Sequence, residues 1–325
     1  MSRNELLYLS QSDVDRLEIP MTEVIQVVEE SFREKAKGRV EVPPKPGIHP
    51  RKDAFIHAMP AYLQKMEAAG VKWVSGYPDN SKRNLPYISG LLILNNTETG
   101  FPVCVMDCTW VTAKRTGAAT AVAAKHLARD DARTLGILGC GVQGRSNLEA
   151  LTTACKSLEN VKAYDVNEEN LHRYVSEMTS RYGLVVTLVS SPKKAVENCD
   201  IVVTAGPILK NPQPVIEAAW FKKGGFACPL DFDSYWKPSA MRSMDKFCTD
   251  DREQLQYYVQ HGYFREIPEV YAELSEIVNG SKPARENASE CIMSMHLGLA
   301  IEDMATAMLV YRRAKEKGIG TFLPL

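Results

Sequence analysis

Three glycines with a fixed spacing are the first residues in this sequence whose arrangement suggests chemistry. Gly139, Gly141 and Gly144 follow an apolar run directly and precede a helix-compatible segment directly. In such a unit the first glycine allows a tight turn, the second lets the backbone approach a pyrophosphate, and the third lets helix and strand pack closely. The helix N-terminus then offers unpaired N–H groups and a partial positive charge to the phosphates. The spacing therefore predicts a loop that binds a dinucleotide.

An aspartate at the end of the next predicted strand refines this prediction. Asp165 follows Gly139 by 26 residues, slightly more than the roughly 20 that is usual for the acid that binds the adenosine ribose hydroxyls. The residues after it contain no arginine for a 2′-phosphate, which favours NAD over NADP as the cofactor. Val142 and Gln143, within the loop, are further expected contacts. The alternative is a solvated aspartate beside a structural turn.

Basic residues in apolar surroundings supply a second kind of chemistry. Lys72 lies between Val71 and Trp73, and Lys114 and Arg115 lie in a segment rich in small residues. A buried arginine can hold a carboxylate with two hydrogen bonds, and a partly desolvated lysine can lose its proton near neutral pH and act in acid–base catalysis. The residues alone leave the alternative open that each side chain lies on a solvated face.

The second half of the chain, from Asp131, alternates short apolar runs with helical stretches. This alternation predicts βαβ units and a parallel, doubly wound α/β sheet of the Rossmann type. The expected strands are 134–139, 160–165, 183–189, 199–205 and 224–230, and the expected helices between them include 143–157 and 168–183.

The first 130 residues predict an α+β arrangement with a largely antiparallel sheet. A helix is expected over Met21 to Lys37, and a last amphipathic helix, near 297–318, is expected to pack back on this half. We therefore predict two domains, 1–118 with 300–325, and 119–299. The expected strands of the first domain are 70–78, 88–96 and 101–107.

Composition limits the partners of this 325-residue chain. Lys plus Arg number 39 and Asp plus Glu number 40, so no net charge attracts nucleic acid or an anionic membrane, and small molecules or other protein chains are the expected partners. The eight cysteines form no Cys-x-x-Cys pair, so neither a disulfide framework nor a metal site is expected. No apolar run approaches the roughly 18 residues that span a bilayer, and no secretory signal is visible. We predict a soluble, cytoplasmic protein.

Six segments together resemble the ornithine cyclodeaminase and mu-crystallin family, which also includes archaeal-type alanine dehydrogenases and ketimine reductases. The block from Lys72 to Arg115, placed ahead of the glycine loop, is specific to that family. The segments are MPAY (59–62), GVKWVSGYPDNSKRNLP (70–86), ETGFPVCVMD (98–107), TAKRTGAAT (112–120), GCGVQG (139–144) and GLAIEDMATA (298–307).

The resemblance implies roles for individual residues. Arg115 is expected to bind the substrate α-carboxylate, with Lys72 beside the reacting amine or imine as a proton-transfer group. Thr116 is an expected cofactor contact. The family's catalytic aspartate lies four residues before a lysine after the fifth Rossmann strand, which here selects Asp233; Asp231 is the second choice. The alternative is that one of these two aspartates only caps the following helix.

Several positions depart from the family pattern near the expected substrate. Lys45 lies near the place of an arginine in cyclodeaminases, and His57 stands at the place of a glutamate; both are expected to bind substrate, although His57 could equally be a core histidine. Phe232 and Trp236 are bulkier than the family's residues, and His296 replaces a common serine. These departures leave ornithine specificity in doubt.

The activity that the resemblance implies is NAD-dependent hydride transfer at the α-carbon of an L-amino acid or a cyclic imino acid. Cyclisation of the imine with loss of ammonia gives an ornithine cyclodeaminase, hydrolysis gives an alanine-type dehydrogenase, and the reverse reaction gives a ketimine reductase. A non-catalytic binding protein like mu-crystallin is the alternative from another class. The resemblance also implies a homodimer, with residues 1–118 and 300–325 forming the substrate-binding and dimerisation domain and 119–299 the NAD-binding domain.

Overall fold

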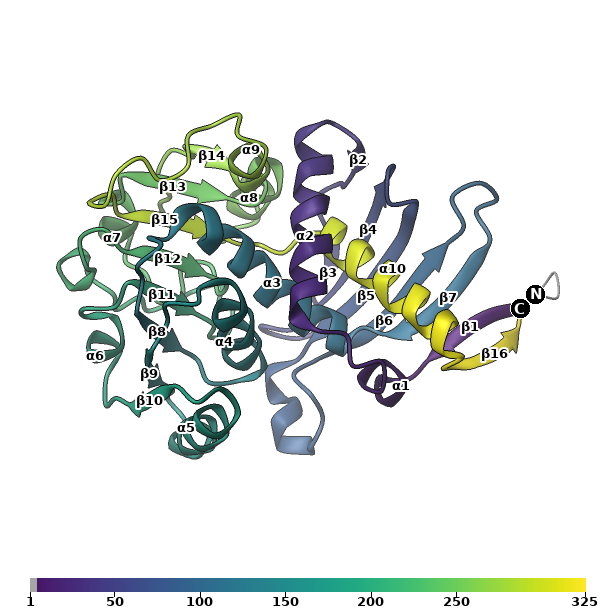
Figure 1. Ribbon diagram of the computed structural model, residues 1–325, viewed down its shortest axis with the longest axis horizontal. Coiled ribbons are helices and arrows are strands. Elements are labelled where there is room, and N and C mark those ends of the chain that lie inside the picture. Colours follow the sequence, from purple (N-terminus) through teal and green to yellow (C-terminus); the bar gives the residue numbers. More distant parts are fainter. Residues whose placement is uncertain (1–4) are drawn as a thin grey trace. The chain divides into compact units, whose positions relative to one another are not determined.

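The computed structural model describes residues 5–325, except for the side chain of Ser81, and its chain forms two compact units (Figure 1). The first unit contains the residues up to Arg115 together with Leu299–Leu325, and the second contains Thr116–Gly298. Helix α3 (Thr109–Leu127) contributes its first turns to the first unit and the remainder to the second. Each unit has its own sheet.

The first unit is built on a sheet with the strand order β16-β1-β7-β6-β5-β4-β2, with β3 paired to β4. All neighbouring strands are antiparallel except β1 and β7, which confirms the predicted architecture. The strands are β1 (Glu5–Leu9), β2 (Val40–Glu41), β3 (Gly47–Ile48), β4 (Phe55–Leu63), β5 (Ala68–Gly76), β6 (Ile88–Asn95), β7 (Pro102–Asp107) and β16 (Thr321–Pro324). The helices are α1 (Gln11–Asp15), α2 (Met21–Ala36), α10 (Ala300–Lys317) and the 3-10 helix η1 (Pro78–Arg83).

Helix α10 covers one face of this sheet. It packs on β4, β5 and β6 and against α2, as Figure 1 shows for the yellow helix. The side chains of a strand alternate between faces, so that Lys72 and Val74 on β5 point to the covered face while Trp73 between them is 48% exposed. The helix ends at Lys317 and is capped by Gly318, whose φ of 62° is the left-handed conformation typical of a helix C-terminus.

The second unit is a fully parallel sheet in the order β10-β9-β8-β11-β12-β15-β13-β14, which confirms the doubly wound prediction. Three strands, β13 to β15, extend it beyond the five expected strands. The strands are β8 (Thr134–Leu138), β9 (Asn160–Tyr164), β10 (Val185–Leu188), β11 (Ile201–Thr204), β12 (Phe226–Pro229), β13 (Lys246–Thr249), β14 (Ala272–Glu273) and β15 (Ile292–Met295). The helices are α4 (Val142–Ala154), α5 (Glu168–Tyr182), α6 (Pro192–Val196), α7 (Pro238–Arg242), α8 (Arg252–Gln260), α9 (Leu274–Val278) and the 3-10 helix η2 (Ala218–Trp220).

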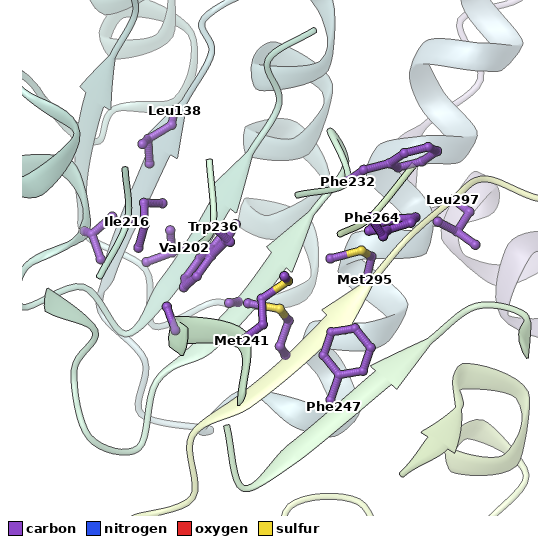
Figure 2. Close-up of a cluster of buried hydrophobic side chains, with 14 of the residues drawn as sticks. Leu138, Val202, Ile216, Phe232, Trp236, Met241, Phe247, Phe264, Met295 and Leu297 are labelled. Carbon is purple, nitrogen blue, oxygen red and sulfur yellow. The ribbon is translucent and has the colours of Figure 1, made fainter. Parts of the chain in front are cut away.

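A buried apolar cluster fixes the segment that follows β12 (Figure 2). Trp236 and Phe232, two departures from the family pattern in the segment expected near the substrate, are 0% and 1% exposed and belong to this cluster. Phe232 has a φ of 60°, a left-handed conformation that favours glycine, and its ring stacks on Phe264 with centroids 4.9 Å apart. The aromatic packing therefore holds an unfavourable backbone conformation beside the two candidate aspartates.

Among the described residues, no helix combines the length and the apolar character that crossing a membrane requires.

Candidate functional site

The glycine loop of the second unit connects β8 to α4. Gly139 has a φ of 103°, and a Cβ added there would lie 2.5 Å from the Ala205 carbonyl oxygen. A Cβ on Gly144 would lie 2.2 Å from the carbonyl oxygen of Gly139. Real Cβ atoms do not approach other atoms so closely, so the packing of the protein itself requires both glycines.

Gly141 is different, because a Cβ added there would meet no protein atom within 4 Å. This residue is the N-cap of α4, and Val142, the first helical residue, is 60% exposed. The missing side chain thus leaves open space in front of the N–H groups at the start of a 13-residue helix. Such a space suits a phosphate group, so the loop fits the pyrophosphate of a dinucleotide.

Asp165 closes this loop from the neighbouring strand. It follows β9 directly, and its Oδ2 accepts a hydrogen bond of 2.7 Å from the Cys140 N–H. Its Oδ1 accepts a 2.8 Å hydrogen bond from the Asn167 N–H. The carboxylate is therefore fixed at the carboxyl end of β9, beside the glycine loop.

The other expected cofactor contacts lie on the two helices next to this loop. Gln143 is in the first turn of α4, where its carbonyl accepts a 2.9 Å hydrogen bond from Asn147 Nδ2. Thr116 lies in α3 and precedes Gly117, where an added Cβ would lie 2.5 Å from the Ser146 carbonyl oxygen of α4. The close approach of the two helices places Thr116 near the N-terminal half of α4.

Substituting Gly141 and Gly144 with alanine should have opposite consequences. Gly141→Ala fills the open space, so NADH binding should weaken at least about tenfold, whereas the melting temperature should change little. Gly144→Ala forces a methyl group onto the Gly139 carbonyl and should cost about 1–3 kcal/mol of stability. Fluorescence titration with NADH and thermal unfolding measure the two effects. Unchanged NADH affinity in Gly141→Ala would contradict this assignment of the phosphate site.

The two candidate aspartates after β12 have different surroundings. Asp231 is fully buried, and it accepts hydrogen bonds from Thr204 Oγ1 at 2.7 Å and from the Gly206 N–H at 2.8 Å. Burial raises the pKa of Asp231 to about 7. Asp233 is 4% exposed, and its Oδ1 has no hydrogen-bond partner among the described residues. Burial also raises the pKa of Asp233. Asp231 thus holds the loop after β11, whereas Asp233 retains a carboxylate oxygen that is available for another partner.

This difference leads to a prediction for the two positions. Asp231→Ala leaves the Thr204 hydroxyl and the Gly206 N–H without their acceptor and should destabilise the protein by about 1–3 kcal/mol. Asp233→Asn removes a charge from a buried position without removing a protein hydrogen bond to Oδ1, so the melting temperature should not fall. Its kcat should drop on the order of 100-fold if Asp233 transfers a proton. A large loss of stability in Asp233→Asn together with normal turnover would instead identify a structural aspartate.

In the first unit, Lys72 and Arg115 form one buried ionic cluster with two acidic residues of α10. Lys72 is 1% exposed, and its Nζ donates to Asp303 Oδ1 at 2.6 Å and to Thr112 Oγ1 at 3.4 Å. Arg115 Nη1 donates to Glu302 Oε2 at 2.7 Å, and Arg115 Nε forms an ion pair of 3.0 Å with Asp303 Oδ1. The alternative of a lysine on a solvated strand face is therefore wrong for Lys72.

The charge state of Lys72 reflects opposing effects. Burial lowers the pKa of its ammonium group, and the Asp303 carboxylate opposes this by stabilising the charge. The Arg115 guanidinium lowers the pKa further. Lys72 is thus an ammonium group that gives up its proton more readily than an exposed lysine, a property that acid–base catalysis uses.

Lys45 and His57 extend this group of basic residues. Lys45 is 8% exposed, and His57, on β4, stacks on Phe55 with ring centroids 4.3 Å apart. Burial lowers the pKa of His57 to about 3, with further contributions from Lys45, His49 and Lys72. His57 is consequently a neutral imidazole on the same face of the sheet as Lys72. The other basic residue of the Arg115 segment, Lys114, lies over the Trp110 ring at 6.0 Å.

The acidic pair Glu302 and Asp303 was not expected among the site residues. Both side chains are 0% exposed. The sequence contained a signal for them, because two adjacent acids followed by the uncharged, largely apolar stretch 304–311 of the same helix need buried cations as partners.

His296, the residue that departs from the family's serine, is held by residues of its own unit. It is 4% exposed at the end of β15, with Nε2 at 2.9 Å from Ser294 Oγ and Nδ1 at 3.6 Å from Cys228 Sγ. No group of three or more His, Cys, Asp or Glu residues in the described part of the chain could hold a metal ion.

The parallel sheet with its glycine loop, together with an α+β unit that carries a buried lysine and arginine, defines a dinucleotide-dependent class of two-domain enzymes. Within that class, the chain belongs to the ornithine cyclodeaminase/mu-crystallin family, whose model matches residues 5–318.

Relatives and solved structures agree with this assignment. An alanine dehydrogenase of Archaeoglobus fulgidus is 37% identical over 98% of this chain and 98% of its own length. The structure of a Thermococcus litoralis Δ1-pyrroline-2-carboxylate reductase in complex with NADH and L-proline is 36% identical, covers 97% of this chain and 99% of its own, and has a TM-score of 0.89. An archaeal alanine dehydrogenase dimer with bound NAD is 35% identical over 99% of both chains, also with a TM-score of 0.89.

Proposed function

We propose that this protein is an NAD-dependent oxidoreductase that acts at the nitrogen-bearing carbon of a small amino or imino acid. The observation that carries the proposal is the buried cluster in which Lys72 and Arg115 share the Asp303 carboxylate. Two buried cations of different chemistry match the two polar groups of such a substrate, its carboxylate and its amine or imine nitrogen.

The cofactor is assigned to the glycine loop of the second unit. The open space at Gly141 and the start of α4 suit its pyrophosphate, and Asp165 suits its adenosine ribose. The absence of arginine between Val166 and Asn170 supports NAD rather than NADP. When bound, the nicotinamide accepts or returns a hydride at the α-carbon. The remaining proposed contacts are Gly139, Val142, Gln143, Gly144 and Thr116.

The chain's own residues position the substrate and move its proton. The guanidinium of Arg115 would bind the α-carboxylate, with Lys45 as a second cation for the same anion. Lys72 would lose or regain a proton at the substrate nitrogen, because burial weakens its hold on that proton. Asp233, with its unpartnered Oδ1, is the proposed second proton-transfer group.

The nature of His57 supports a dehydrogenase or an imine reductase over a cyclodeaminase. Cyclodeamination requires a substrate with a second amine, which is cationic when it binds. A carboxylate at position 57 would hold that cation, whereas a neutral imidazole beside Lys45 and Lys72 provides no negative charge for it. A substrate side chain without positive charge therefore suits this site best.

We further propose a homodimer that forms through the open face of the first unit's sheet. Trp73 on β5 and Leu91 on β6 are paired neighbours that are 48% and 47% exposed. Paired exposed apolar side chains of this size are typical of protein interfaces. The solved alanine dehydrogenase with a similar fold is a dimer.

One set of assays tests the proposed activity. Purified protein is incubated with NAD⁺ and a panel of L-amino acids, and with NADH and cyclic imino acids, while NADH absorbance and ammonia are followed. We expect NADH to accumulate with an amino acid that has an uncharged side chain, or imine-dependent NADH consumption. Ammonia release from ornithine without net NADH would contradict the argument from His57. Tight NADH binding without any turnover would indicate a binding protein and overturn the proposal.

A further inference from the structure

We propose that Asp303 is a positioning residue: one of its two carboxylate oxygens contacts both Lys72 and Arg115, fixes them relative to one another and places a negative charge beside the lysine. This inference rests on the proposed function, because it concerns the two groups that are assigned to the substrate.

The contact geometry is the first argument. Asp303 Oδ1 accepts from Lys72 Nζ at 2.6 Å and lies 3.0 Å from Arg115 Nε. One oxygen atom therefore contacts both cations, and a displacement of this atom displaces both. Groups that must meet a substrate in a defined geometry gain from such a shared anchor, because an error of about 1 Å can cost on the order of 100-fold in rate.

The anchor itself is rigidly held. Asp303 lies in the first turns of α10, where the helix dipole stabilises a negative charge. The preceding residue, Glu302, accepts a 3.1 Å hydrogen bond from the Leu299 N–H at the start of the helix and pairs with Arg115 through its other oxygen. The helix packs on β4 and β5, the strands that carry His57 and Lys72.

Stability alone does not explain this carboxylate. Asp303 is 0% exposed, and its Oδ2 has no hydrogen-bond partner among the described residues. A buried ion pair generally stabilises a fold no better than apolar residues of the same volume, and an unsatisfied buried oxygen makes the balance worse. The arrangement is therefore better explained by control of the two cations.

Asp303 is also the anion closest to Lys72 among the groups that face it. Helix α3 presents Arg115 and Thr112, and the residue before the helix, Cys108, has a thiol whose pKa is raised by burial, so that it stays neutral. His57 on β4 is neutral as well. Without the Asp303 charge, Lys72 would face the positive Arg115 and would lose its proton at a lower pH.

The test compares Asp303→Asn with Glu302→Gln. The second variant removes the neighbouring acid, whose carboxylate pairs with Arg115 but not with Lys72. The first readout is thermal stability between about pH 6 and about pH 10, which requires no activity. Burial lowers the pKa of Lys72 in the folded state, so the cost of burying its charge is fully present below that pKa and is lost progressively as the pH rises from it toward the ordinary lysine pKa of the unfolded chain. Asp303→Asn increases this cost.

We therefore expect the stability gap between wild type and Asp303→Asn to narrow as the pH rises, and the gap for Glu302→Gln to stay constant, because arginine does not titrate in this range. In a Lys72→Met background, the pH dependence of the Asp303→Asn gap should vanish. The second readout is the pH profile of kcat/KM, whose Lys72-dependent limb should shift to lower pH in Asp303→Asn, with a loss on the order of 100-fold at neutral pH. Asp303→Glu, which keeps the charge on a longer side chain, should restore the profile but not the full kcat.

A gap that is constant with pH for both variants, or an unshifted kcat/KM profile in an active Asp303→Asn enzyme, would overturn the inference while the proposed function stands. A different outcome would be a wild-type protein that shows no turnover, although the stability difference between wild type and Asp303→Asn narrows with rising pH. That outcome would support the role of Asp303 and overturn the proposed function. If Asp303→Asn does not fold, Asp303→Glu decides the question: a wild-type kcat in this variant would contradict the positioning role.

Discussion

Replacement of Lys72 with methionine should reduce kcat by a factor on the order of 100 to 10,000, the range in which a general acid–base group contributes. Methionine matches the length of the lysine stem but cannot donate or accept a proton. The Asp303 carboxylate retains its contact with Arg115 in this variant, so the fold should persist. Single-turnover kinetics with saturating cofactor and substrate would measure the loss, and NADH affinity should remain at the wild-type value.

Another buried lysine provides a matched control. Lys246, in the second unit, is 5% exposed and pairs with Glu286 at 2.7 Å and with Glu290 at 3.2 Å. Lys246→Met breaks these ion pairs and should lower the free energy of unfolding. It should not change the shape of the pH profile of kcat/KM. If Lys72→Met and Lys246→Met reduce kcat by similar factors, Lys72 has no special role in proton transfer.

Replacement of Arg115 with alanine should impair both substrate binding and stability. Loss of one partner of a buried charge pair costs roughly 2–5 kcal/mol of binding, so KM for a carboxylate substrate should rise at least about 30-fold. Glu302 and Asp303 would also lose a cation, which should destabilise the first unit by about 3–5 kcal/mol. Steady-state kinetics and chemical denaturation measure the two effects.

Two variants separate substrate binding from stability. Arg115→Lys keeps the positive charge and should recover most of the stability but little of the affinity, because an ammonium lacks the planar fork that fits a carboxylate. Arg313→Ala removes an Arg–Glu pair of the same unit at a partly exposed position, with Glu23 at 2.7 Å, and should leave KM unchanged. A wild-type KM in Arg115→Ala would remove Arg115 from the substrate site.

The fold followed from the sequence to a large extent, because both units rest on strong periodic signals. The expected helix over Met21 to Lys37 is α2 (Met21–Ala36), and the expected strand 160–165 is β9 (Asn160–Tyr164). Strand β16 gave no comparable signal, because all of its four residues are exposed and no burial pattern distinguishes them from a loop. Its pairing with β1, more than 300 residues away, is a tertiary effect.

The site could be predicted only in part. Local sequence identified Lys72 and Arg115 as candidates, but their burial depends on the alternation of β5 and on the helix that covers it. The acids that pair with them lie on α10, and no local pattern reveals a contact between residues 72 and 303. The family resemblance placed Asp233 ahead of Asp231, but no local pattern showed their different surroundings, which arise from the loop after β11 that Asp231 holds.

The first unit is formed by two segments that lie far apart in the sequence, and this has a consequence for its synthesis. Lys72 leaves the ribosome long before its counter-ion, because 231 positions separate it from Asp303. Residues Thr116–Gly298 are continuous and can assemble while the nascent chain still lacks α10 and β16. During that interval the face of the sheet that carries Lys72 lacks its covering helix, so the lysine stays hydrated until α10 has been translated.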